Sequence, residues 1–421
     1  MRIGIHPALK RHDGGIYQYT VTLLDALREL SASPGGVWDH EFVVFAHSPD
    51  DPVLKRCVDS GWTVKPFRPP WAPHPSIDLN KLPEVDSPLE QSDMRAWLEE
   101  CGIDLMLYPS PHRLSFESGI PFVMAIHDLQ HLLQPEFPEV SEGGEWQRRE
   151  YVLRNAARSA TVLVAESQVG REDILNAYGR YGVDAEGVKA LPYLPDPSID
   201  PQAARERVPQ LRKQYDLADR YLFYPAQFWP HKNHVRLVEA LGLLRRKYGL
   251  VIPMVLAGSA TGEIRQRIIT KVEDRLRELG LEDQVRMPGY VSDEDLFGLY
   301  AGAEALVMPT FFGPTNIPFL EAWALDCPVL TSRIRGIVEQ VGDAAVTVDP
   351  KSVEDIAVGI RRLWTDETLR RTLIEKGRAR LRAYTPEDFR QRLREIIDEA
   401  TKRVRRGGRQ RTAQVASGGG V

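Results

Sequence analysis

Cysteine and long apolar runs are scarce in this sequence, and each scarcity excludes a class of protein. The 421 residues include 3 cysteines, Cys57, Cys101 and Cys327, whose spacing fits neither a disulfide framework nor a metal cluster. No apolar run approaches the ~20 residues that span a bilayer, and the first residues form no signal-peptide hydrophobic region. We therefore expect free thiols and a cytoplasmic location.

Two short motifs are also missing. No Gly-x-Gly-x-x-Gly follows the first expected strand at residues 2–6, which argues against a dinucleotide-binding dehydrogenase. No Asp-x-Asp dyad lies at a strand end, since the pair Asp293 and Asp295 is better explained as capping of the helix that follows. The sequence therefore predicts no bound metal and no cofactor.

Charge is distributed unevenly along the chain. The net charge is -5, yet residues 402–421 contain only basic charges. The acidic remainder argues against general nucleic-acid binding. Residues 404–421, rich in Gly and Ser, are predicted to be a disordered basic tail. This tail is either a solvated terminus or a peripheral contact with anionic lipid headgroups at the membrane's inner face.

The chain length fits two domains of about 200 residues each. Strands alternate with helices through residues 1–205, and the alternation restarts near Tyr221 and continues through residues 206–385. Residues 182–215 are predicted to form the linker between the two domains. Residues 48–88 are rich in Pro and are predicted to form an irregular excursion or a lid. The sequence predicts an α/β protein with two similar parallel sheets.

One stretch, residues 309–329, is central to the functional prediction. It follows an apolar strand at residues 304–308 and contains a Gly/Pro loop and a helix start. The free N–H groups of Asn316 and Ile317 would suit an anion such as a diphosphate. Glu321, about one turn into the helix, is placed to accept hydrogen bonds from a ribose. An ordinary loop with a solvated glutamate is the alternative.

This stretch, Pro-Thr-Phe-Phe-Gly-Pro-Thr-Asn-Ile-Pro-Phe-Leu-Glu, resembles the donor-site signature of retaining glycosyltransferases of family four. The resemblance implies the GT-B architecture, in which two Rossmann-like domains face a central cleft and a helix, here residues 386–403, packs back on the N-terminal domain. It also implies donor contacts by Gly313 and Thr315. The family signature usually has two glutamates, and the first of them falls on Gly313 here.

A second segment of the resemblance is residues 226–234. Relatives have Gly-Arg-x-x-x-x-Lys-Gly, whose Arg and Lys hold the donor diphosphate. This chain keeps Lys232, where an ammonium group can neutralise phosphate oxygens, and has Gln227 in place of Arg. His231 or His234 is a candidate for the missing charge. Without the neighbouring matches to the family pattern, Lys232 would be interpreted as an ordinary surface lysine.

Two further segments match the family pattern. Gly289, Tyr290 and Val291 fall where relatives hold the nucleotide base through main-chain groups. The pair Gly14 and Gly15 after the first strand permits close approach of the backbone to a ligand, and relatives place such a loop against the donor phosphates and the acceptor.

His127 follows an expected strand at residues 122–126, at the sheet edge where α/β proteins place their chemistry. The resemblance puts this histidine beside the transferred sugar. A buried neutral histidine bonded to Asp128 is the alternative, and His112 and His131 are weaker candidates.

These residues together predict a hexosyltransferase with His127, Lys232 and Glu321 in catalytic positions. The resemblance implies retaining transfer from a GDP- or UDP-linked sugar to a hydroxyl of a glycan or lipid-linked glycan. One alternative is a degenerate GT-B protein that binds a nucleotide sugar without transfer, which the changes at Gly313 and Gln227 would favour. Another is a sugar-nucleotide epimerase or hydrolase, which needs no acceptor.

Overall fold

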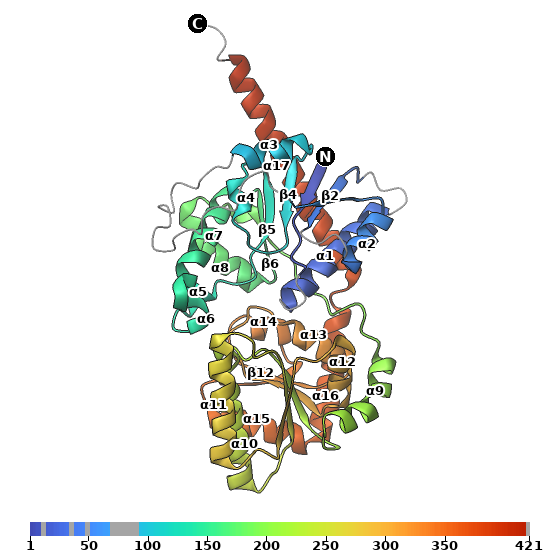
Figure 1. The fold of residues 1–421 in the computed structure, drawn as a ribbon, viewed down its shortest axis with the longest axis vertical. Helices are drawn as coiled ribbons and strands as arrows, with labels where there is room; N and C mark the ends of the chain where they lie inside the picture. The colour runs from blue at the N-terminus through green and yellow to red at the C-terminus, as the bar shows by residue number, and fades with distance from the viewer. Residues whose placement is uncertain (10–13, 33–37, 47–50, 68–91, 418–421) are drawn as a thin grey trace. The chain divides into compact units, whose positions relative to one another are not determined.

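The computed structural model describes residues 1–9, 14–32, 38–46, 51–67 and 92–417, with side chains up to residue 406. The chain forms two compact units (Figure 1). Unit 1 comprises Met1–Leu133, Ser141–Tyr193 and Pro386–Val421, and unit 2 comprises Gln134–Val140 and Leu194–Thr385. Each unit has its own parallel sheet, so the predicted α/β class with two similar sheets is confirmed.

The sheet of unit 1 has the order β3-β2-β1-β4-β5-β6-β7, and every described pairing is parallel. The strands are short and mostly apolar because helices cover both faces of a parallel sheet. Their bounds are β1 Arg2–Ile5, β2 Glu41–Ala46, β3 Thr63–Pro66, β4 Leu105–Tyr108, β5 Phe122–Ala125, β6 Val162–Ala165 and β7 Val188–Ala190.

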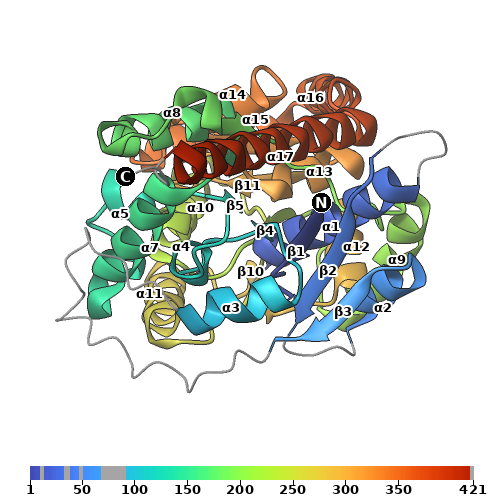
Figure 2. The same cartoon turned by 90° about the horizontal axis from the view of Figure 1, so that it is seen from above.

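The longer helices of unit 1 alternate with these strands. In the view from above, β2 and β3 (blue) lie on the side of the unit opposite helices α5 and α7 (green; Figure 2). The Ser167 hydroxyl caps α8 by accepting a hydrogen bond from Gly170 N at 2.9 Å. The helix bounds are α1 Gly15–Ala32, α2 Pro52–Asp59, α3 Ser92–Glu100, α4 Leu114–Glu117, α5 Gln130–Leu133, α7 Glu145–Ser159, α8 Gln168–Tyr178 and α17 Pro386–Ser417.

Helix α17 returns to unit 1 after the whole of unit 2. It packs against α1, and Trp38 Nε1 donates a hydrogen bond to Asp398 Oδ1 at 2.9 Å. Arg403 of the same helix pairs with Asp184 at 2.9 Å. The helix continues to Ser417, beyond residue 403, where the sequence places its end.

The excursion predicted for residues 48–88 is wrong in part. Helix α2 and strand β3 occupy much of residues 52–66, and β3 forms the edge of the sheet. Asp51 caps α2, and Pro52 begins it, so the prolines that suggested irregular chain in fact include a helix start. Residues 68–91, and with them the predicted lid, lie outside the described residues.

The sheet of unit 2 has the order β10-β9-β8-β11-β12-β13, again with parallel pairing throughout the described strands. Strands β9 and β10 are added on one side of β8, and the later strands β11, β12 and β13 are added on its other side. The order therefore reverses between β8 and β11, where open α/β sheets bind ligands. The bounds are β8 Leu222–Pro225, β9 Met254–Ala257, β10 Val285–Gly289, β11 Ala305–Met308, β12 Val329–Ser332 and β13 Ala345–Val348.

Helices α10 and α11 lie on one side of this sheet, and α9 and α12 lie on the other (Figure 1). The predicted linker at residues 182–215 is wrong in part, because β7 and α9 fall inside it. Also in unit 2 are α6 Pro138–Ser141, most of which lies in the segment Gln134–Val140, and the short helix η6 Pro230–Lys232. The other helix bounds are α9 Pro201–Gln214, α10 His234–Tyr248, α11 Glu263–Leu279, α12 Asp293–Gly302, α13 Ile317–Ala324, α14 Ile337–Val341, α15 Val353–Thr365 and α16 Glu367–Arg382.

Candidate functional site

Two loops at the carboxyl ends of β8 and β11 are tied together in unit 2. Asn233 Nδ2 donates to the carbonyl oxygens of Pro309 at 2.9 Å and Pro350 at 2.8 Å. Phe311 N donates to His231 O at 2.7 Å. The loops at residues 226–233 and 309–316 therefore form one platform at the position where the strand order reverses.

Lys232 lies on this platform, at the end of η6 and just before α10. Its backbone is fixed because Tyr224 Oη donates to Lys232 O at 2.9 Å. The side chain is half-buried. The sequence-predicted lysine thus lies at the sheet edge where an anion would bind.

Neither neighbouring histidine is a free cation. The buried ring of His234 stacks between those of Tyr224 and Phe228, with centroids 4.8 and 4.5 Å away. Burial, together with the charge of Lys232, lowers the pKa of His234 to about 3, so this side chain is neutral. His231 Nδ1 lies 2.6 Å from the Glu139 carboxylate. His234 therefore cannot supply the charge missing at Gln227.

Gln227 itself contacts a cation that sequence reasoning missed. Its Oε1 accepts hydrogen bonds from Trp229 Nε1 at 2.9 Å and from Arg265 Nη1 at 2.6 Å. Arg265 lies in the first turn of α11, which follows β9. The sequence did offer one signal: Arg265 lies in the first turn of the helix that follows β9, and β9 is the neighbour of β8 in the sheet.

The loop at residues 309–316 explains the glycine at residue 313. Gly313 has φ +147°, and a Cβ there would lie 2.7 Å from Asn316 Nδ2. A glutamate at residue 313 would not fit this loop without rearrangement. In this structure, a larger residue at 313 would have to displace the Asn316 side chain.

The predicted diphosphate donors at the start of α13 have different environments. Asn316 N donates to Gln340 Oε1 at 2.8 Å, and Gln340 Nε2 donates back to Asn316 O at 2.8 Å. Contact of the Asn316 amide with a ligand would require Gln340 to release it. Ile317 is the first residue of α13, and Thr315 lies half-buried in the loop before it.

Glu321 is not a solvated glutamate. It is 6% exposed, and its Oε2 accepts a hydrogen bond from Tyr300 Oη at 2.9 Å. Burial, with the negative charges of Asp196 and Asp293, raises the pKa of Glu321 to about 7. A buried carboxyl group with this pKa at a sheet edge is a functional-site candidate.

The turn predicted to hold a base follows β10. Gly289 has φ +77°, and its carbonyl oxygen accepts a hydrogen bond from Gly258 N at 2.8 Å. Tyr290 is 67% exposed, and Val291 is half-buried. This turn therefore presents an exposed aromatic ring at the same edge of the sheet as the two loops.

In unit 1, His127 is held by two acceptors. Its Nδ1 contacts a Glu166 carboxylate oxygen, and its Nε2 lies 2.9 Å from Pro109 O. Burial lowers the pKa of His127, but Glu166 outweighs this effect and raises it above the ordinary value. The raised pKa favours the protonated ring, in which both nitrogens donate hydrogen bonds.

The alternative of His127 bonded to Asp128 is wrong in its partner, because the carboxylate that contacts His127 is Glu166. Asp128 pairs with Arg149 and accepts a hydrogen bond from Gln130 N at 2.8 Å. Burial raises the pKa of Asp128, but Arg149, the Gln130 N–H and His127 together outweigh burial, and the net shift is downward. Asp128 thus remains ionised beside the start of α5.

The weaker histidine candidates have structural roles. His131 is buried, with Nε2 3.1 Å from Glu150 Oε2, and Tyr178 Oη donates to the same oxygen at 3.0 Å. His112 Nδ1 accepts a hydrogen bond from Leu114 N at 3.2 Å. Neither geometry indicates a reactive group.

The glycine loop after β1 is described only at its end. Gly14 has φ +58°, which glycine adopts without strain, and Gly15 begins α1. Residues 10–13 lie outside the described residues.

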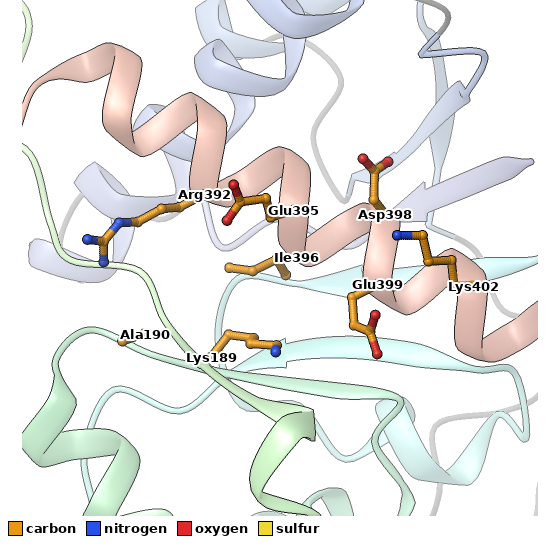
Figure 3. A pocket seen from close by; sticks show the side chains of 8 residues that line it. All are labelled: Lys189, Ala190, Arg392, Glu395, Ile396, Asp398, Glu399 and Lys402. Atoms are coloured by element: carbon orange, nitrogen blue, oxygen red, sulfur yellow. The ribbon is translucent and has the colours of Figure 1, made fainter.

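A cavity of about 560 Å³ also lies in unit 1, where β7 meets α17 (Figure 3). Basic and acidic side chains line it in equal numbers, and Lys189 points toward Glu399 (Figure 3). We interpret it as part of the packing of α17. Its lining is Lys189, Ala190, Arg392, Glu395, Ile396, Asp398, Glu399 and Lys402.

Within the described ranges, no group of three or more His, Cys, Asp or Glu residues could hold a metal ion. In the same part of the chain, no helix is long and apolar enough to cross a membrane.

Most of unit 2 matches a known protein family. Residues 209–380 match the family described as glycosyl transferases group 1. The O-antigen chain mannosyltransferase B of Escherichia coli is 29% identical over 279 residues, which cover 66% of this chain and 69% of that protein. Residues 209–380 are a group 1 glycosyltransferase domain.

Other relatives of the glycosyltransferase are longer or more distant. The serotype-specific mannosyltransferase WbdA of Escherichia coli is 26% identical over 261 residues, and the match spans only 30% of its length. The structure of Anabaena Alr3699/HepE in complex with UDP-glucose has a TM-score of 0.68 at 19% identity, covering 94% of this chain and 99% of that one. This similarity supports the GT-B fold of the glycosyltransferase.

Sequence reasoning missed four partners in the sites of this glycosyltransferase. Tyr300, Gln340 and Arg265 contact predicted residues in unit 2, and Glu166 contacts His127 in unit 1. Each acts through a contact between residues far apart in the chain, which no local motif encodes.

Proposed function

We propose that this glycosyltransferase moves a hexose from a GDP- or UDP-linked donor to a hydroxyl of a glycan or lipid-linked glycan, with retention of anomeric configuration. The observation that carries the donor site is Glu321, buried against Tyr300 near the start of α13. Such a carboxyl group has the hydrogen-bonding capacity to recognise the two hydroxyls of a ribose.

In this proposal the donor lies along the carboxyl edge of the unit 2 sheet. The base contacts the turn at residues 289–291, the ribose contacts Glu321, and the diphosphate contacts Lys232 and the start of α13 at Ile317. Gln227, Gly313, Thr315 and Asn316 complete the predicted donor contacts. A lysine and helix N–H groups stabilise a leaving diphosphate electrostatically, so the proposal assigns no role to a metal or a cofactor.

The reaction breaks the bond between the anomeric carbon and the diphosphate oxygen. A new bond forms on the same face of the sugar to the acceptor oxygen, and the acceptor proton passes to the departing phosphate. His127, held by Glu166 and the Pro109 carbonyl, would bind or orient a sugar hydroxyl or the acceptor. Gly14 and Gly15 are the proposed acceptor-side backbone contacts.

The mannosyltransferase names of two relatives support a hexose donor and a role in polysaccharide biosynthesis. We propose that the enzyme works in the cytoplasm, with peripheral contact to the inner face of the membrane when its acceptor is lipid-linked. No role in nucleic-acid binding is proposed.

The test is transfer itself. The purified enzyme is incubated with GDP-mannose or UDP-glucose and a lipid-linked glycan extract, and nucleotide release and the anomeric configuration of the product are measured. We expect release that depends on the acceptor and a retained anomer. Lys232→Met should lower turnover at least about 100-fold, because an unneutralised diphosphate is a poorer leaving group. The matched control Lys271→Met changes an exposed lysine of α11 and should act like wild type.

A non-catalytic protein that binds nucleotide sugars remains the second candidate, because Gly313 replaces a family glutamate. It would bind the donor without release of nucleotide. A hydrolase or epimerase would consume the donor equally well without the extract. An inverted product would contradict the proposed stereochemistry.

A further inference from the structure

Arg265 lies over an aromatic ring at the edge of the unit 2 sheet. Its Cζ lies 4.6 Å from the centroid of the Trp229 ring. Its Nη1 donates to Gln227 Oε1 at 2.6 Å, and Trp229 Nε1 donates to the same oxygen at 2.9 Å. Stacking and hydrogen bonding together fix the plane of the guanidinium.

The charge of this guanidinium is not balanced within the described part of the chain. No carboxylate there pairs with Arg265, whereas Arg275 and Arg277 on the same helix both form ion pairs with acids. Its Nε is buried and has no hydrogen-bond partner among the described residues. Burial alone lowers the pKa of Arg265. A partly buried cation in this state is stabilised by a bound anion.

Arg265 and Lys232 act on one loop. Phe228 N donates to Ser259 O at 3.4 Å, and a Cβ on Gly258 would lie 2.1 Å from Ala226 O, so the segments after β8 and β9 are in close contact. Within the first segment, Lys232 N donates to Trp229 O at 2.9 Å. Trp229 therefore contacts the Arg265 guanidinium through its ring and the Lys232 backbone through its carbonyl oxygen.

We propose that Arg265 is the second cation that binds the donor diphosphate, opposite Lys232, and that Gln227 orients it. This inference rests on the proposed function, because it assigns a residue to the diphosphate part of that donor site. Trp229 and Gln227 restrain the Arg265 guanidinium before the ligand binds. Less side-chain entropy is therefore lost when the guanidinium binds phosphate oxygens.

The competing role is structural, with Arg265 serving only to hold Trp229. The two roles predict different ligand dependence. A phosphate-binding arginine affects ligands that carry phosphate and adds to the salt dependence of binding. A structural clamp affects nucleoside and nucleotide alike, because it acts through the shape of the loop.

The test is calorimetric titration of wild type, Arg265→Met and Arg277→Met with GDP, UDP, guanosine, uridine and inorganic pyrophosphate at two salt concentrations. Arg277 is the matched control, an exposed arginine of the same helix paired only with Asp274. We expect Arg265→Met to weaken nucleoside diphosphate and pyrophosphate binding about 10- to 100-fold, to flatten the salt dependence and to leave nucleoside binding unchanged.

The inference is overturned if wild type binds a nucleoside diphosphate and Arg265→Met binds it equally well, or if nucleoside affinity falls by the same factor. The donor site would still stand in both cases. A wild-type protein that binds no nucleotide overturns the donor site and the inference together. If Arg265→Met fails to fold, Arg265→Lys replaces it, and retention of part of the diphosphate affinity with unchanged nucleoside affinity is then expected.

Discussion

Glu321 is the residue whose environment differs most from that of an ordinary side chain of its type. Its pKa of about 7 in the folded chain lies above the value of 4.5 for a free glutamate. The folded state therefore binds this proton more tightly than the unfolded state. Stability from this group is complete below about pH 4.5 and is lost as the pH rises through 7.

We therefore expect Glu321→Gln to stabilise the protein above pH 7 and to have little effect near pH 5. Glutamine resembles the protonated carboxyl group and still accepts the Tyr300 hydrogen bond. The gain in free energy of unfolding at pH 8 should be roughly 2–3 kcal/mol. Urea unfolding of both proteins at pH 5 and pH 8 measures it. An equal difference at the two pH values would show that the ionisation of Glu321 is not the cause.

At the scale of elements, the loop before α13 has a positive φ at residue 313, where an added Cβ would contact the Asn316 side chain. Gly313→Ala should lower the free energy of unfolding by roughly 2–3 kcal/mol, because a strained φ adds to the contact with Asn316. Gly249→Ala is the matched control, since Gly249 has φ +64° but nothing lies within 4 Å of its Cβ position. Its cost should be only about 1 kcal/mol. Equal losses in urea unfolding would refute the proposed steric cause.

The sequence predicted central elements better than edges and contacts. Strands β4, β5, β11 and β12 are recognisable because they are fully buried apolar runs. Strand β3 was missed because it is a sheet edge with half-buried and exposed residues. Helix α9 was read as linker because Pro and charged residues fill it, although Asp200 and Pro201 form a regular helix start.

The site shows the same division. Motifs placed Lys232 and Glu321 at the carboxyl edge of the unit 2 sheet, as the strand order requires. They could not show that Gln340 occupies the Asn316 amide or that Arg265 lies beside Gln227. Those contacts join different loops, so they follow only from the packed structure.

At the scale of the whole molecule, the chain is two α/β units with separate cores and a C-terminal helix that belongs to the first unit. Segment Gln134–Val140 belongs to the second unit, held by Gln134 Nε2, which donates to Phe311 O at 2.9 Å, and by the contact of Glu139 with His231. The main chain therefore passes between the units four times. The donor site proposed for unit 2 can be tested without reference to the acceptor.

The most direct test is calorimetric titration of the whole protein with GDP, UDP and ADP in buffer free of divalent metal, on wild type and Glu321→Ala. We predict micromolar binding of one nucleotide to wild type and loss of that binding in the variant, which removes the proposed ribose contact. Thermal unfolding of the variant at the same pH verifies that it is folded. Binding of none of the three nucleotides, or equal binding by a folded Glu321→Ala, would contradict the donor site at the centre of this account.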